Sequence, residues 1–212
     1  MKKEPTTPSR KPRADHVVAV FCALAMLAAI PGWQTSNRTV TTSDSAGRHI
    51  IHLDERPGAG MYWNPTPDFT DGDIEVDVRG RDVYQKSFIG IAFHVENDTT
   101  LDAVWLRPFN FRAADSTHRA HAVQYAAYPE ASWERLRGDF PGKFEAPLAA
   151  DPSAWIHLHL MLRGRDLQVF VDSASTPALR VQTTGKHKHG GVGLWVGDFS
   201  PGDFANLQIR KR

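Results

Sequence analysis

Residues 155–171 read W-I-H-L-H-L-M-L-R-G-R-D-L-Q-V-F-V, and this stretch decides the fold class. On both sides of Gly164, apolar side chains alternate with polar or bulkier ones, which is the two-residue period of a β-strand with one buried face. The turn at Gly164 therefore predicts a hairpin of two strands, residues 155–163 and 166–171. The positions expected in the core are Ile156, Leu158, Leu160, Leu162, Leu167, Val169 and Val171.

From residue 48 onward the chain breaks into similar short runs, separated by Gly, Pro, Asn and Asp. None shows a sustained helical period, so we expect an all-β protein. One open sheet rarely holds so many strands, which predicts a two-sheet antiparallel jelly-roll β-sandwich closed by residues 48–53 beside 204–210. Residues 128–152 are irregular and are expected to form an ordered loop at the rim of a site. The expected strands are 48–53, 73–79, 88–95, 101–109, 121–125, 155–163, 166–171, 178–182, 191–196 and 204–210.

The composition narrows the class of protein. A chain of 212 residues with 41% hydrophobic residues and six Trp can form one well-buried domain. Its formal net charge of +1 creates no global field for nucleic acid or for a membrane surface, so neither is expected as a partner. The single cysteine, Cys22, leaves no possibility of an intramolecular disulfide.

The N-terminal segment has the pattern of an export signal. A basic leader precedes an apolar run at residues 17–30, which is short for a membrane-spanning helix of about 20 residues. We expect residues 1–33 to be a signal peptide, and an uncleaved anchor is the alternative. Residues 34–47 are rich in Thr and Ser and are expected to be a linker before the domain at 48–212. The expected location is periplasmic or extracellular, with membrane anchoring by residues 17–30 as the alternative.

Residues 101–110, L-D-A-V-W-L-R-P-F-N, contain the best functional clue. If they form a regular strand, Trp105, Arg107 and Phe109 share one face, and Val104 lies on the other. An aromatic ring and a guanidinium on one face indicate a binding surface.

The preceding run supports a hollow beside this surface. Across residues 87–95, bulky apolar residues alternate with Gly90, Ala92 and His94. Small side chains next to a large ring and a cation leave room for a ligand. The two runs together predict one wall of a groove.

An ordered series of motifs resembles the concanavalin A-like lectin/glucanase superfamily over residues 48–210. Within it, the chain is similar to bacterial laminin-G-like domains and to the 3-keto-disaccharide hydrolase-like group. The resemblance implies two antiparallel sheets, one of them concave, with carbohydrate the usual ligand on the concave face. The motifs are F-T-D-G-D-I-E-V-D-V at 69–78, F-I-G-I-A-F-H at 88–94, W-L-R-P-F-N at 105–110, A-V-Q-Y at 122–125, W-E-R-L-R at 133–137, G-L-W-V-G at 193–197 and F-A-N-L at 204–207.

A sugar site needs a flat apolar surface for the ring and fixed polar groups for the hydroxyls. Two tryptophans could provide the surface, and several polar residues could bond hydroxyls from the centre or the rim. The alternative is that Arg107 and Gln124 only satisfy loop carbonyls and that Trp105 only packs. The substrate-binding candidates are Trp105 and Trp133 as platforms, His94, Arg107, Asn110 and Gln124 as polar contacts, and Tyr125 and Arg137 on the rim.

Catalysis is a second hypothesis. Asp73, Glu75 and Asp77 share a strand face. The family-16 glucanases of the superfamily that this chain resembles carry catalytic carboxylates in a comparable E-x-D-x-E arrangement, but this sequence reads D-I-E-V-D and lacks the two outer glutamates. Acids on a strand are also a routine protection against edge-to-edge aggregation. In a glycoside hydrolase of the 3-keto-disaccharide type, Glu75 or His94 would be the general acid or base. A structural or adhesion module without a small ligand is the third hypothesis.

No cofactor is expected, and calcium is the open alternative. Asp198 and Asp203 flank a turn and could supply oxygen ligands, although local hydrogen bonding explains the same residues. The H-x-H pairs at 157–159 and 187–189 lack an obvious third zinc ligand. The chain has no glycine-rich phosphate loop and no nucleophile elbow, so the sequence gives no support for phosphoryl transfer or serine-hydrolase chemistry.

Overall fold

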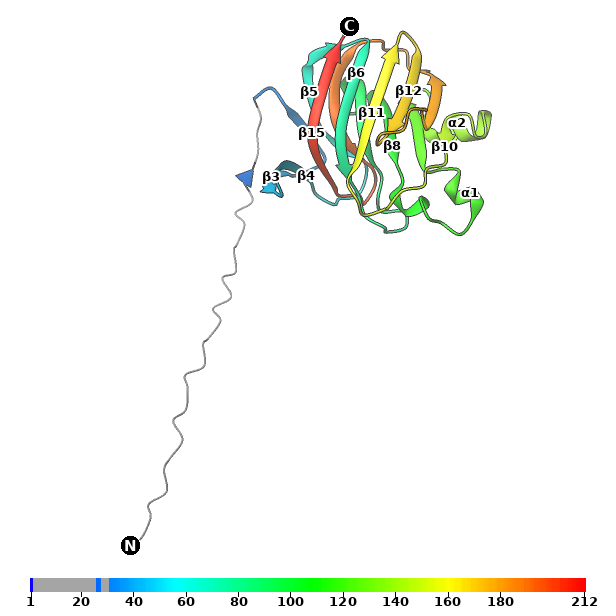
Figure 1. Cartoon of the computed structure of the whole chain (residues 1–212). Coiled ribbons are helices and arrows are strands. Elements are labelled where there is room, and N and C mark those ends of the chain that lie inside the picture. The colour runs from blue at the N-terminus through cyan, green and yellow to red at the C-terminus, as the bar shows by residue number, and fades with distance from the viewer. Residues whose placement is uncertain (2–25, 28–30) are drawn as a thin grey trace.

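The computed structural model describes residue 1, residues 26–27 and residues 31–212. Two antiparallel sheets pack face to face around the core, as predicted for a jelly-roll β-sandwich (Figure 1). Figure 1 shows two small helices, α1 (Ser116–Arg119) and α2 (Trp133–Asp139), on one side of the sandwich, close to β10 (Glu145–Ala146). A 3₁₀ helix, η1 (Pro108–Asn110), follows β8 (Thr100–Leu106).

The eight-stranded sheet contains the predicted hairpin. Arg163 pairs with Asp166, and Gly164 between them has φ of +60°, a conformation that glycine adopts without a steric penalty. The alternate leucines of β11 (Ile156–Arg163) are buried. Phe204 pairs with Ile51, so the expected closure of β15 (Gly202–Lys211) against β4 (Arg48–Leu53) is confirmed. The order is β1 (Met26–Leu27), β3 (Val40–Ser45), β4 (Arg48–Leu53), β15 (Gly202–Lys211), β6 (Gly72–Arg79), β11 (Ile156–Arg163), β12 (Asp166–Val171) and β13 (Leu179–Gln182).

The seven-stranded sheet has one face on the core and one face turned away from it. Ile91 and Val104 lie side by side on the core face, whereas Gly90 and Trp105 lie side by side on the other. The order is β10 (Glu145–Ala146), β9 (Val123–Tyr128), β8 (Thr100–Leu106), β7 (Ile89–Asn97), β14 (Gly190–Val196), β5 (Gly60–Phe69) and β2 (Gln34–Ser36).

The expected linker at residues 34–47 is instead part of the sandwich, because it provides β2 and β3. Val40 is buried in the core, and the Arg38 guanidinium donates hydrogen bonds to the carbonyls of Gly58 and Gly197, both at 2.7 Å. These two contacts hold a Thr- and Ser-rich segment that composition alone does not identify as strand.

Most of the predicted export segment lies outside the described residues. Of residues 1–33 the structure describes 1, 26–27 and 31–33, and Met26 and Leu27 pair with Thr42 and Thr41. Among the residues that the structure describes, no helix is long and apolar enough to cross a membrane.

Two segments near the predicted site differ from the expected strand and loop. β8 ends at Leu106, because Pro108 has no backbone N–H and begins η1. The region predicted as an irregular loop contains α2, which Ser132 caps by accepting a hydrogen bond from the Arg135 N–H at 3.4 Å. Both changes bring polar side chains to the same side of the seven-stranded sheet.

Candidate functional site

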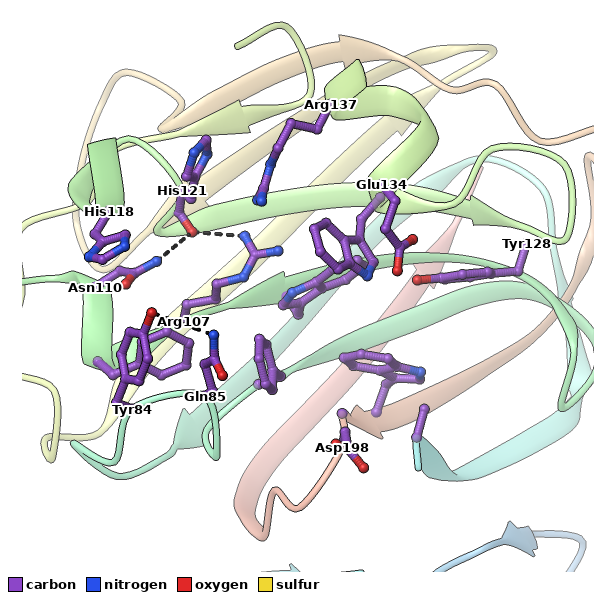
Figure 2. A pocket seen from close by; sticks show the side chains of 17 residues that line it. Tyr84, Gln85, Arg107, Asn110, His118, His121, Tyr128, Glu134, Arg137 and Asp198 are labelled. Atoms are coloured by element: carbon purple, nitrogen blue, oxygen red, sulfur yellow. Dashed lines mark hydrogen bonds between the residues drawn. The ribbon is translucent and has the colours of Figure 1, made fainter. Parts of the chain in front are cut away.

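A pocket of about 590 Å³ opens on the face of the seven-stranded sheet that is turned away from the core (Figure 2). Its volume lies in the range of small-ligand sites in proteins. Strands β8, β9 and β14 provide part of the lining, and α2 together with residue 59 and the loops around residues 84–88, 107–121 and 197–198 provides the rest. The lining residues are Ala59, Tyr84, Gln85, Phe88, Trp105, Arg107, Phe109, Asn110, His118, His121, Tyr128, Trp133, Glu134, Arg137, Trp195, Gly197 and Asp198.

Two indole rings lie together in the strand-borne part of the pocket. The centroids of Trp105 and Trp195 are 5.0 Å apart and their planes are tilted by 32°. Gly90 lies between them in register, pairing with Trp195 on one side and Trp105 on the other. A Cβ at Gly90 would collide with the carbonyl oxygen of Val104 and lie 2.6 Å from Trp105 Cα. The glycine therefore permits the close approach of β7 and β8 beneath the rings.

A buried carboxylate holds the cationic wall of the pocket, which consists of Arg107 and Arg137. The Glu145 side chain is only 2% exposed and accepts hydrogen bonds from Arg107 Nη1 at 3.3 Å and from Arg137 Nε at 2.9 Å. Arg137 Nη2 also donates to it. His121 Nδ1 lies 2.9 Å away without hydrogen-bond alignment. Glu145 thus fixes two guanidinium groups at the edge of the pocket, beside the His121 imidazole.

The charge of this wall follows from burial. Burial lowers the pKa of Arg107 to about 10, which leaves the guanidinium charged at neutral pH. Burial also lowers the pKa of His121 below its ordinary value, so this imidazole is mainly neutral at pH 7. Two positive charges therefore share one negative charge, that of Glu145.

Arg107 is held from several directions. It donates from Nη1 to the His121 carbonyl at 2.8 Å and from Nη2 to Gln124 Oε1 at 3.2 Å. Its guanidinium carbon also lies 5.6 Å from the ring centroid of Trp105 and 5.7 Å from that of Trp133. Figure 2 shows Asn110 donating to the same His121 carbonyl, at 3.3 Å. The orientation of the arginine is therefore set before any ligand binds.

The structure brings Trp105, Arg107, Asn110, Trp133 and Arg137 together in one pocket, as the sequence predicted. Gln124 is fully buried and does not line it. Its amide instead donates to the Tyr125 carbonyl at 2.7 Å while its oxygen accepts from Arg107. The predicted alternative, in which Arg107 and Gln124 donate hydrogen bonds to backbone carbonyls, is therefore correct in part.

The predicted roles of His94 and Tyr125 as ligand contacts are wrong, because neither residue lines the pocket. His94 Nδ1 lies 3.0 Å from Asp102 Oδ2, and the Tyr125 hydroxyl donates to the other oxygen of Asp102, all within the buried interior. His94 has φ of +49° at a register shift of β7 after Phe93, so regular alternation does not apply to it. This cluster ties β7, β8 and β9 together.

The predicted catalytic carboxylate is also away from the pocket. Glu75 lies in β6 of the other sheet, where its carboxylate pairs with His157 Nε2 at 3.2 Å and with Arg210. Its face points away from the core and also carries Asp73 and Asp77, whereas its ion-pair partners are a basic and an imidazole group. Neither Glu75 nor His94 therefore fits the predicted general acid or base role in this pocket.

The two predicted calcium ligands are separated. Asp198 lines the pocket and accepts a hydrogen bond from the Gly58 N–H at 2.6 Å. Asp203 lies in β15 of the other sheet, between His52 at 2.7 Å and Arg79 at 2.7 Å. Within residues 31–212, no group of three or more His, Cys, Asp or Glu side chains could hold a metal ion.

Several lining residues were not predicted from the sequence. Tyr84 is 58% exposed and packs edge-on against Phe109 at 5.6 Å. The sequence did contain a signal for Trp195 as a pocket residue, because it is the only large ring in the G-L-W-V-G motif. Glu134 directly follows Trp133, but sequence gave no reason to place α2 over the pocket. The other unpredicted residues are Ala59, Gln85, Phe88, His118, His121, Tyr128 and Gly197.

Comparisons with known proteins give the fold. No family model matches the sequence, and no curated protein matches it. Among solved structures, the chain is similar to carbohydrate-binding module CBM66 from Bacillus subtilis, at 16% identity and a TM-score of 0.63 over 85% of this chain and 96% of that one.

Two other structures give the same result. The exoplasmic/lumenal domain of VIP36 in its Ca²⁺- and Man3GlcNAc-bound form is 13% identical, with a TM-score of 0.54 over 86% of each chain. A Bacillus subtilis protein of unknown function with a galectin-like fold is 13% identical, with a TM-score of 0.52 over 85% of this chain and 90% of that one. The chain therefore has a lectin-like β-sandwich fold.

Proposed function

We propose that this protein is an exported carbohydrate-binding domain whose pocket on the seven-stranded sheet holds a glycan or glycoside. The observation that carries the proposal is the combination of indole rings with a fixed guanidinium in one open pocket. Rings cover the C–H face of a pyranose, and oriented donors fix its hydroxyl groups. No feature of the chain indicates nucleic acid as a partner, or a membrane beyond the N-terminal segment.

Structural neighbours support this ligand class. One is a carbohydrate-binding module, and another was solved with a mannose-containing glycan. Binding without cleavage is the preferred form of the proposal, because Glu75 and His94, the predicted catalytic candidates, lie outside the pocket. A glycoside hydrolase of the 3-keto-disaccharide type would need other residues for proton transfer.

A glycan array with two tryptophan variants tests the proposal. Trp133→Ala removes a half-buried ring from the pocket and should weaken binding of any hit about tenfold, equivalent to about 1.4 kcal/mol. Trp155→Ala is the matched control, because that half-buried ring packs under Arg48 and Arg79 on the other sheet. Absence of any hit, or equal loss in both folded variants, would contradict the proposal and favour an adhesion module.

Export is proposed on the pattern of residues 1–33, a basic leader followed by an apolar run. Mass spectrometry of the protein recovered outside the cytoplasm should show loss of this segment. Recovery of an intact chain in the membrane fraction would support the anchored alternative, and recovery in the cytoplasm would contradict both.

A further inference from the structure

We infer that the ligand is an anionic sugar, whose carboxylate or sulfate group binds beside Arg107 and Arg137. The inference rests on the proposed carbohydrate-binding function and specifies the ligand class of that pocket.

The first step is the charge balance of the wall. The single carboxylate of Glu145 is bonded by both arginines, so one positive charge remains without a neutralising partner there. None of these contacts uses Nη1 of Arg137 or Nε of Arg107. A buried cation that is only partly compensated favours an incoming anion, because the local dielectric is low.

The second step is access from the pocket. The Arg137 side chain is 34% exposed, whereas Glu145 behind it is closed off. The Arg137 guanidinium lies 4.7 Å from the ring centroid of Trp133. Figure 2 shows Arg137 and Arg107 pointing toward each other at one side of the pocket. A sugar stacked on Trp133 would therefore present a charged substituent next to both arginines.

The acidic lining residues stand apart from this wall. In Figure 2, Asp198 lies on the opposite side of the pocket from Arg137, and Glu134 lies beside Tyr128. Asp198 is already bonded to the Gly58 N–H. The pocket is therefore polarised, with the two arginines at one side and the two carboxylates away from them. This arrangement orients an anionic ligand as well as attracting it.

The test is an array of matched pairs on the purified full chain. Each uronic-acid glycan is printed beside its carboxyl-reduced form, and each sulfated glycan beside its desulfated form. We expect hits among the charged members, bound about tenfold or more tightly than their neutral partners and weakened by added salt. The two kinds of pair distinguish carboxylate from sulfate.

Failure of the inference and failure of the proposed function give different results. Neutral members that bind as tightly as their charged partners would overturn the anionic ligand and leave carbohydrate binding intact. Absence of binding to every member of the array would overturn both proposals.

Three variants locate the effect. Arg137→Gln should weaken binding of a charged hit about tenfold or more and weaken its neutral partner much less, whereas Glu134→Gln should tighten binding of the charged hit. Arg163→Gln is the control, because that guanidinium bonds Asp73 on the other sheet. Equal weakening of charged and neutral ligands by Arg137→Gln, or no gain from Glu134→Gln in a folded protein, would contradict the inference.

Discussion

Glu145 is the residue on which the cationic wall depends. Its carboxylate is buried in the short strand β10 and is the common partner of Arg107, Arg137 and His121. Removal of a buried acid leaves a buried cation without compensation, and that cost exceeds the loss of the hydrogen bonds alone. The side chain was not a sequence candidate, because its significance appears only when β10 pairs with β9.

Glu145→Gln should therefore lower the free energy of unfolding by about 3 to 5 kcal/mol. Chemical denaturation at neutral pH measures this change. Glu55→Gln is the comparison, because Glu55 forms an ion pair with Arg81 at the surface and should matter little. Similar stability of the two variants would contradict the role given to Glu145.

Gly90 sets the spacing of β7 and β8 beneath the tryptophans. Gly90→Ala should destabilise the protein by about 3 kcal/mol, because the new Cβ would lie against the backbone of β8. Gly138 provides a matched control, since a Cβ there meets nothing within 4 Å and the residue is in α2. Gly138→Ala should instead stabilise by about 0.5 to 1 kcal/mol. Thermal or chemical unfolding of both variants distinguishes the two signs, and a tolerated Gly90→Ala would refute the spacing argument.

At the scale of elements, alternation predicted strand faces wherever the register is regular. Alternation correctly predicted the β11–β12 hairpin and placed Trp105 and Val104 on opposite faces of β8. It failed at His94, where β7 changes register, and at Pro108, where β8 gives way to η1. Such breaks depend on cross-strand partners, which a single strand's sequence does not contain.

The His52–Asp203 pair on the outer face of the eight-stranded sheet should make the free energy of unfolding depend on pH. The hydrogen bond that His52 Nδ1 donates to the Asp203 carboxylate raises the pKa of His52, despite the opposing effect of burial. This pair therefore stabilises the fold below the ordinary histidine pKa, and its contribution is lost as pH rises through the raised value.

The destabilisation caused by His52→Gln should accordingly be larger at pH 5.5 than at pH 8. Denaturation of both proteins at the two pH values measures the difference. His49→Gln is a suitable control, because His49 pairs with Asp44 at an exposed edge. A destabilisation by His52→Gln that is equal at the two pH values would rule out the linkage.

At the scale of the whole molecule, the sandwich supplies a rigid sheet and the connections supply the walls of the pocket. The fold class, the closure of β15 on β4 and five lining residues were predictable, because they depend on local pattern or on the superfamily resemblance. The positions of Tyr84, Glu134 and Asp198 were not, because the loops and α2 meet only after the sheets have packed. Likeness to carbohydrate-binding modules and lectins gives the fold, whereas the pocket residues carry the proposed function.

A crystal structure of the protein with its best glycan ligand tests the central claim most directly. We expect a sugar ring against Trp133, within the pocket that Trp105, Trp195 and Arg107 also line. A sugar bound instead on the outer face of the eight-stranded sheet, beside Trp155 or Glu75, would contradict it.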